Sequence, residues 1–290
     1  MKPSNQGYLA VFSLLLAATF WGVIWYPLRL LEVRGLVGLW ATLAMYLTPL
    51  ALLSIPLLIK SRKWMRTAPL SLILLSIAAG WTNMAFILAV IEGPVVRVML
   101  LFYLSPIWAV LLGYFILGES VHRQQIPVIL LAMVGAFVML WRPGIGLPIP
   151  TSDNEWLAIS AGVAFSLNNV MGRKLHAMPL APKIMVSWIG VVLLSVGTIV
   201  VSSEPIPDIS LETAGYAAAL GIFGIAVITS SVLYGLSHMP VSRSSVIMLF
   251  ELVAGSVSAA LLTSEVILPQ EWLGGAFILL SALLSARQQR

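Results

Sequence analysis

The sequence predicts an all-α integral membrane protein. Ten transmembrane helices are expected to form two inverted five-helix repeats around a central cavity, with both termini in the cytoplasm. Three observations predict this fold class: an apolar composition, ten long apolar runs and an internal repeat. Of the 290 residues, 60% are hydrophobic and 9% are charged, and the mean hydropathy is +1.00. A soluble domain is about 25% charged, so this chain carries too little charge to cover a water-facing surface.

The same composition excludes several classes of protein. A chain this apolar is neither intrinsically disordered nor collagen-like, and it is not a nucleic-acid-binding domain despite its net charge of +5. The sequence contains no Cys, which excludes disulfides, thiolate catalysis and Cys-based metal sites. No cofactor or metal is therefore expected from composition or motif.

Ten apolar runs are bounded by charged residues, Pro or Gly. They cover residues 8–31, 36–59, 69–90, 94–117, 125–141, 155–175, 182–203, 212–235, 241–264 and 270–286. A helix needs about 20 apolar residues to cross the hydrocarbon core. The runs are continuously apolar, whereas the strands of a membrane barrel alternate in polarity, so helices are expected. The first run is longer than the apolar region of a signal peptide and is expected to remain as the first helix.

The basic residues predict the orientation of these helices. If the N-terminus is cytoplasmic, 12 of the 16 Lys and Arg residues fall on the cytoplasmic side. Most Asp and Glu residues fall on the outer side. An excess of Lys and Arg in cytoplasmic loops orients membrane helices. We therefore expect both termini inside, in the cytoplasmic (inner) membrane of a bacterium.

An internal repeat divides the chain into two halves. A shift of 146 residues superimposes, without a gap, Pro94 on Pro240, Arg97 on Arg243 and Glu119 on Glu265. The expected boundaries are a first repeat at 1–141, a periplasmic linker rich in Pro and Gly at 142–154, and a second repeat at 155–290. Because each half holds an odd number of helices, the second half must be inserted upside down. Inverted repeats are typical of secondary transporters.

Several short motifs carry a resemblance to a known family. They are A-A-T-F-W-G at 17–22, Y-L-S-P at 103–106, L-G-E at 117–119, F-E-L at 250–252 and T-S-E at 263–265. With the two five-helix halves, they resemble the drug/metabolite transporter superfamily, in particular its EamA-type exporters. The resemblance implies export of small metabolites, often amino acids or related amphipathic compounds, through a cavity lined by the first, third, fourth, sixth, eighth and ninth helices.

Two positions depart from the patterns of this superfamily. In the second repeat of this superfamily a Pro often follows the acidic residue, whereas here Leu252 follows Glu251. Y-L-S-P is similar to the Y-L-W-P of aromatic amino-acid exporters, but Ser105 replaces the Trp, which leaves aromatic specificity open.

Glu251 is the one acidic residue deep within an expected span. Charges within a span are costly and are functional candidates by default. Ser244, Gly255 and Ser258 lie 7, 4 and 7 residues away, which places a small, polar stripe on the same helix face. Glu251 is therefore a candidate for coupling transport to protons or for pairing with a substrate amine. The alternative is a structural carboxylate bonded to a neighbouring helix.

The other candidates for the cavity are amide, hydroxyl or aromatic side chains expected near mid-span. They are Asn83, Asn168, Thr229, Trp21, Trp81, Tyr103 and Ser105. Amides and hydroxyls suit a polar head group, and aromatic rings bind apolar or cationic groups. The alternatives are interhelical bonding for the amides and core packing for the rings. Trp25 lies shallower and is expected in the interfacial aromatic belt.

Three residues are candidates for gating. Pro106 lies mid-helix and is a plausible hinge, because proline kinks helices. Arg97 and Arg243 begin the fourth and ninth expected helices, and their symmetry suggests equivalent gates at opposite faces. The alternative is that both snorkel to the interface.

Enzymatic chemistry finds no support in the motifs. The sequence has no GxxxxGK[ST] loop, no HExxH site and no deeply placed His to activate a nucleophile. The leading interpretation is a non-enzymatic secondary transporter that exports an amino-acid-like metabolite by alternating access, with protons as one option for coupling. A multidrug or quaternary-cation exporter is the alternative within transport. A passive channel or a membrane scaffold, neither of which has a transport cycle, is the alternative from another class. The expected partners are the substrate and the bilayer; a monomer is sufficient and a dimer is possible.

Overall fold

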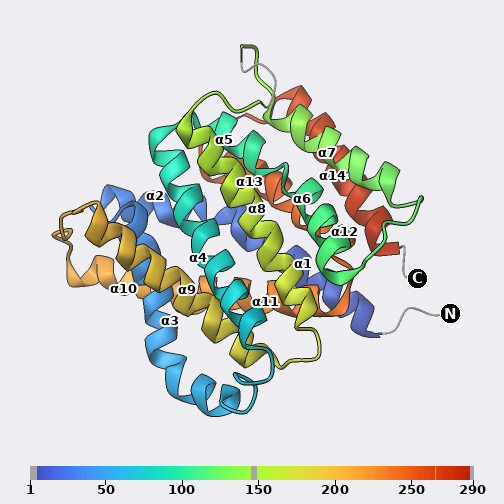
Figure 1. Ribbon diagram of the computed structural model, residues 1–290. Coiled ribbons are helices and arrows are strands. Elements are labelled where there is room, and N and C mark those ends of the chain that lie inside the picture. The colour runs from blue at the N-terminus through green and yellow to red at the C-terminus, as the bar shows by residue number, and fades with distance from the viewer. Residues whose placement is uncertain (1–4, 145–148, 265, 288–290) are drawn as a thin grey trace.

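The structure is a computed structural model that describes residues 5–144, 149–264 and 266–287, and in this part of the chain all regular structure is helical. Figure 1 shows the arrangement. The first half contains α1 (Asn5–Val23), α2 (Trp25–Val33), α3 (Gly38–Ser61), α4 (Pro69–Glu92), α5 (Val95–Phe102), α6 (Ser105–Leu112), the π-helix η1 (Gly113–Leu117) and α7 (Ile126–Leu140). The second half contains α8 (Asp153–Lys174), α9 (Leu180–Val201), α10 (Leu211–Leu220), the π-helix η2 (Gly221–Ile225), α11 (Ala226–His238), α12 (Val241–Met248), α13 (Phe250–Leu262) and α14 (Pro269–Arg287).

Each of the ten apolar runs falls on helical structure. Seven segments of the described chain are long and apolar enough to cross a membrane: Gln6–Val33, Gly38–Pro56, Pro69–Ile91, Val95–Leu117, Leu180–Val201, Leu211–His238 and Val241–Leu262. The run at 125–141 forms a shorter apolar helix, Ile126–Leu140. The runs at 155–175 and 270–286 form α8 and α14, which are not among the segments long and apolar enough to cross a membrane. The chain is thus a multi-pass membrane protein, and the count of ten spans stays a prediction.

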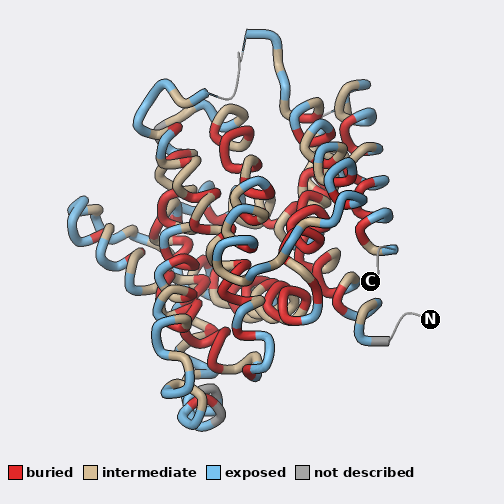
Figure 2. The backbone as a smooth tube through the Cα atoms, turned by 45° about the vertical axis from the view of Figure 1, so that its right-hand side comes forward, coloured by how far each residue is buried: buried red, intermediate tan, exposed pale blue. Residues whose placement is uncertain are grey.

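Many large apolar side chains lie exposed on the outer surface, as a lipid-facing surface requires. Large side chains such as Phe115, Leu52 and Phe223 are 76%, 62% and 71% exposed. In Figure 2 the buried residues follow the contacts between helices, and the exposed residues lie on the outward faces. In a membrane these faces contact acyl chains, so their apolar exposure costs nothing.

The two halves pack on each other in a reciprocal way. α1 of the first half packs on α11 of the second, and α4 packs on α8. The pairs α3–α9 and α7–α14 join equivalent helices of the two halves, and α7 and α14 lie side by side in Figure 1. This pairing maps onto itself when the halves are exchanged, as expected for two related repeats.

Close approach of small residues holds α7 and α14 together. A Cβ added at Gly135 on α7 would lie 2.7 Å from the carbonyl oxygen of Gly274 on α14, and one added at Gly274 would lie 2.5 Å from that of Gly135. Small residues allow helix backbones to approach where no hydrophobic effect drives them together. The glycines therefore set the close contact between α7 and α14.

Two of the long spans are interrupted at equivalent places. The helix from Val95 is interrupted at Tyr103 and Leu104, directly before Ser105 and Pro106, and the helix from Val241 is interrupted at Leu249. Proline lacks an N–H and favours a helix start over a helix interior, which accounts for the first break. The sequence does not explain the second, because Leu252 stands at the position matching Pro106.

Two groups of contacts define the ends of the molecule. At the linker end, the residues around Val95, Trp141, Thr151 and Pro269 come together; for example, the side chain of Gln270 donates to the carbonyl oxygen of Trp141 at 2.8 Å. At the opposite end, Glu119 meets Arg173 and the start of α12. Glu265, the repeat counterpart of Glu119, lies outside the described residues.

Candidate functional site

A central cavity of about 320 Å³ lies between the two halves. Its polar lining comes from both of them: Thr42, Thr82, Asn83, Asn168, Ser187, Thr229 and Glu251. Its aromatic lining is larger: Trp21, Trp25, Tyr46, Phe86, Phe102, Tyr103 and Phe165. Among the described residues that line it, Glu251 is the only acidic or basic side chain.

A second cavity of about 420 Å³ opens at the linker end. We call it the vestibule. Its lining includes Val95, Ser256, Val266 and Glu271. It shares Trp21, Trp25, Met99, Tyr103 and Glu251 with the central cavity. Because the two cavities share these side chains, they meet at the level of Tyr103 and Glu251.

Glu251 lies at the junction of the cavities because of the helix break beside it. It lies in the first turn of α13, two residues after Leu249. The hydroxyl of Tyr103, at the break between α5 and α6, donates a hydrogen bond to Oε1 of Glu251. This bond joins the two interrupted helices, one from each half. The arrangement can hold a cation, or a proton, at the carboxylate.

Helix α1 covers this site at close range. A Cβ added at Gly22 would lie 2.5 Å from the carbonyl oxygen of Glu251 and 2.8 Å from the backbone nitrogen of Gly255. The near contact brings Trp21 and Trp25 over both cavities. The Trp25 indole donates to Ser258 Oγ at 2.8 Å. Trp25 was expected in the interfacial belt and instead lines the site.

The amides differ in how far their hydrogen bonds are satisfied. Asn83 Nδ2 donates to the carbonyl oxygen of Ala79 at 2.9 Å, and Asn83 Oδ1 accepts from the Tyr46 hydroxyl at 3.2 Å. Thr229 Oγ1 accepts from the Trp188 indole at 3.1 Å. Asn168 lines the cavity, and its amide makes no hydrogen bond within the described part of the chain. Asn168 is therefore the amide best placed to bind a ligand.

Two expected cavity residues lie elsewhere, which corrects their placement. Trp81 is 38% exposed and donates to Ser160 Oγ at 3.1 Å. Trp81 lies two residues before the cavity-lining Asn83, so on a helix its side chain points about 200° away from that of Asn83. Ser105 is buried beside the helix break, and its carbonyl oxygen accepts from Ser166 Oγ at 2.8 Å. Neither side chain lines the central cavity or the vestibule.

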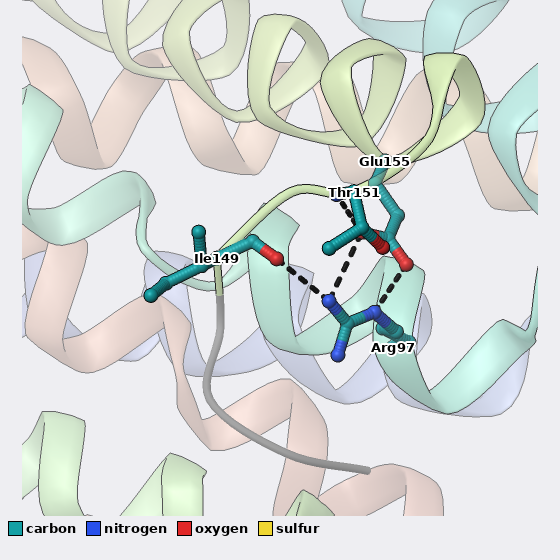
Figure 3. Close-up of polar contacts among 4 residues, drawn as sticks. All are labelled: Arg97, Ile149, Thr151 and Glu155. Atoms are coloured by element: carbon teal, nitrogen blue, oxygen red, sulfur yellow. Dashed lines mark hydrogen bonds and ion pairs between the residues drawn. The ribbon is translucent and has the colours of Figure 1, made fainter.

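The two arginines expected as equivalent gates have different partners. Arg97 forms an ion pair with Glu155, and its Nη2 donates to the carbonyl oxygen of Ile149 at 2.6 Å (Figure 3). Glu155 Oε2 also accepts from the backbone N–H of Thr151 at 2.6 Å. Arg97 thus fastens the linker to α5 and α8.

Arg243 is buried within the protein, beside the end of α14. Its Nε donates to the carbonyl oxygen of Ser285 at 2.8 Å. A cation at the C-terminal carbonyls of α14 is favourable because those carbonyls carry partial negative charge. The equivalence of Arg97 and Arg243 in sequence therefore does not extend to their contacts.

Sequence reasoning missed part of the cavity wall. Thr82 precedes Asn83 by one residue and Phe86 follows it by three residues, and both line the cavity with Asn83. Their spacing with Ala79 is that of one helix face, which is a signal that could have found them. Tyr46 and Ser187 carried no comparable signal, because they reach the cavity through the packing of α3 on α9.

Comparisons with known proteins agree with this architecture. The sequence model of the EamA-like transporter family matches residues 8–141 and again 154–287. The two matches are offset by 146 residues, the same shift that aligns the internal repeat.

Two curated relatives are each called Protein RarD, one from Salmonella typhi and one from Salmonella typhimurium. Each is 31% identical in an alignment of 180 residues, and the match covers 57% of this chain and 53% of the relative. The chain thus spans about half the length of the curated relatives it matches.

A solved crystal structure of another protein has a similar fold. It superposes with a TM-score of 0.75 at 16% sequence identity, covering 97% of this chain and 98% of the other. At that identity the likeness supports the fold alone. The double match of the family model covers most of the sequence, and on that evidence the chain belongs to the EamA-like transporter family.

Proposed function

We propose that this protein exports a small amphipathic metabolite with an amino group, such as an amino-acid-like compound, across a bacterial cytoplasmic membrane by alternating access. The observation that carries the proposal is the Tyr103–Glu251 hydrogen bond at the breaks of two equivalent helices, with a cavity on each side of it. Interrupted helices at mid-depth are where transporters of inverted-repeat architecture bind their substrates.

The proposal includes ten spans with both termini in the cytoplasm. Besides the seven long apolar segments, α7, α8 and α14 complete the count. In support, α7 and α14 approach as closely as Gly135 and Gly274 allow, and α8 packs along α4 and α6. The repeats then occupy 1–141 and 155–290, with residues 142–154 as a periplasmic linker. In this orientation the vestibule faces the periplasm.

The lining residues suggest how a substrate is held. The Glu251 carboxylate pairs with the amino group, and the ring faces of Trp21 and Tyr103 contact the cationic and apolar parts. Asn168 supplies a donor or an acceptor for a polar group. A volume of about 320 Å³ suits a small metabolite. A proton that competes for Glu251 would couple transport to the proton gradient.

One observation favours a second candidate, an exporter of quaternary or other organic cations. The described residues lining the central cavity include seven aromatic side chains and no Lys or Arg. A substrate carboxylate would thus have only neutral donors, whereas a cation without a carboxylate would have both Glu251 and the rings.

Counterflow in proteoliposomes tests both candidates. Vesicles are preloaded with pooled amino acids or with a quaternary ammonium compound, and uptake of the labelled species against its gradient is measured. The proposal expects amino acids to drive counterflow. Counterflow with the quaternary compound alone would select the second candidate. Flux without counterflow of any compound would indicate a passive channel and overturn both.

A further inference from the structure

The end of the molecule opposite the vestibule is closed by a carboxylate that bridges the two halves. Glu119, in the loop after η1 of the first half, accepts two hydrogen bonds from the second half. Arg173 Nε, at the end of α8, donates to Oε1 at 2.9 Å. The backbone N–H of Val241, at the start of α12, donates to Oε2 at 2.9 Å. One side chain thus ties the first half to two helices of the second.

A second layer lies behind this bridge. Arg173 Nη1 donates to the carbonyl oxygen of Ser237 at 3.0 Å, and Lys183 Nζ donates to Ser237 Oγ at 2.6 Å. Lys183 is fully buried. We call Glu119, Arg173, Lys183, Ser237 and Val241 the inner clasp. One helical turn further along α9, Ser187 lines the central cavity, so the inner clasp lies directly beneath the cavity floor.

The linker end is arranged differently at the matching positions. Val95, the repeat counterpart of Val241, is 49% exposed and lines the vestibule. In the first helix of each half a shift of 144 residues aligns Arg29 with Arg173, and Arg29 is exposed. Val241, by contrast, is 1% exposed beneath the Glu119 carboxylate. Equivalent parts of the two halves are therefore in close contact at the Glu119 end of the molecule, whereas at the linker end they are separated by the vestibule.

We propose that the inner clasp is the cytoplasmic gate of the transport cycle, with Glu119 as the group that must exchange its protein partners for water each time the cavity opens inward. This inference rests on the proposed function and orientation. The side chains of Arg173 and Glu119 are 26% and 24% exposed. Ion pairs this accessible are worth little net free energy, so the gate can open reversibly. The Val241 N–H is at a helix N-terminus, where a carboxylate is favourable and water can replace it.

The test uses the absence of Cys from the chain. A single reporter, Ser187→Cys, is placed in the cavity wall. Inside-out vesicles are treated with a membrane-impermeant maleimide, and the labelling rate from the cytoplasmic side is compared between the parent, Glu119→Gln and Arg173→Gln. Arg142→Gln is the matched control, since Arg142 Nη2 pairs with Glu271 Oε1 at 2.7 Å, which joins the linker to the second half at the other end of the molecule.

The gate predicts slow labelling in the parent and in Arg142→Gln. Labelling should be faster by about two- to fivefold in Glu119→Gln and Arg173→Gln, the effect of removing an accessible ion pair worth up to about 1 kcal/mol. The double swap Glu119→Arg with Arg173→Glu restores the ion pair but not the acceptor for Val241. It should label at an intermediate rate, and it keeps the test decisive if a single variant misfolds. Equal labelling rates in all the variants that fold would overturn the gate.

A cross-linking measurement separates the gate from the proposed function. In Glu119→Cys with Arg173→Cys, a short reducible thiol cross-linker should abolish counterflow, and reduction should restore it. Labelling needs no substrate. A gate confirmed by labelling in a protein that moves none of the tested compounds would therefore refute the proposed substrate class and not the gate. Full counterflow in the cross-linked protein would refute the gate alone.

Discussion

The packing of α4 on α9 makes Gly190 one of the most constrained positions in the membrane region. Gly190→Ala adds a methyl group that meets the backbone of Ser76 on α4. The added carbon would lie 2.5 Å from the carbonyl carbon and 2.7 Å from Oγ of Ser76, and closer still to the carbonyl oxygen. Gly80, one turn along α4, faces Gly190 in return. No flexible side-chain end is available to move aside, so the two helices must separate.

The cost follows from these distances. Carbon atoms pack at about 3.5–4.0 Å, so the helices must part by about 1 Å. Overpacking of a well-packed interior costs about 1–3 kcal/mol. For a protein of this size 1 kcal/mol corresponds to about 2–4 °C in Tm. Gly190→Ala should therefore lower Tm by about 2–12 °C. Because α4 carries Asn83 and α9 carries Ser187 to the cavity, transport should fall as well.

The matched control is Gly197→Ala, two turns further along the same helix. A Cβ at Gly197 meets nothing within 4 Å, and Ala is favoured over Gly in a helix by up to about 1 kcal/mol. Its Tm should be unchanged or raised. Thermal unfolding of the detergent-purified variants, followed by fluorescence, measures both. The reasoning is refuted if Gly190→Ala is as stable as Gly197→Ala.

Three further predictions concern the site and the linker. Tyr103→Phe removes the hydroxyl that donates to the Glu251 carboxylate and orients it. In a binding titration the affinity for substrate should fall by about tenfold. An unchanged affinity would show that the bond does not position the carboxylate. Trp21→Ala should weaken affinity by about 2- to 30-fold through loss of a cation–π contact, while Trp81→Ala, outside the cavity, should leave it unchanged; equal losses would contradict the placement of the two rings. The backbone N–H of Thr151 donates to Glu155 at 2.6 Å. Glu155→Gln should therefore speed amide hydrogen exchange at Thr151 by at least about fivefold. Exchange at the parental rate would show that the Arg97–Glu155 contacts do not fasten the linker.

The helices were predictable because lipid imposes a simple rule. Every backbone polar group must be satisfied internally in hydrocarbon, so a long apolar run has to be helical, and all ten runs are helical here. The interruption at Leu249 was not predictable, because the residues around it favour an unbroken helix.

The site was predictable where one helix face settles the matter. Glu251, Asn83, Asn168, Trp21, Tyr103 and Thr229 all line the central cavity. Trp81 and Ser105 do not, because depth in the membrane says nothing about which way a side chain points. The partners of Arg97 and Arg243 were not predictable either. They are set by the linker, which has no repeat equivalent, and by the C-terminus of α14.

Counterflow by Glu251→Gln beside the parent tests the central claim most directly. The substitution keeps the shape of the side chain and removes its charge. The account predicts that the parent exchanges an amine-bearing substrate and that Glu251→Gln, shown to be folded by an unchanged Tm, loses either exchange itself or only accumulation driven by a pH gradient. Loss of exchange assigns Glu251 to substrate, and loss of accumulation alone assigns it to the proton. Exchange and accumulation at parental rates in the variant would contradict the account.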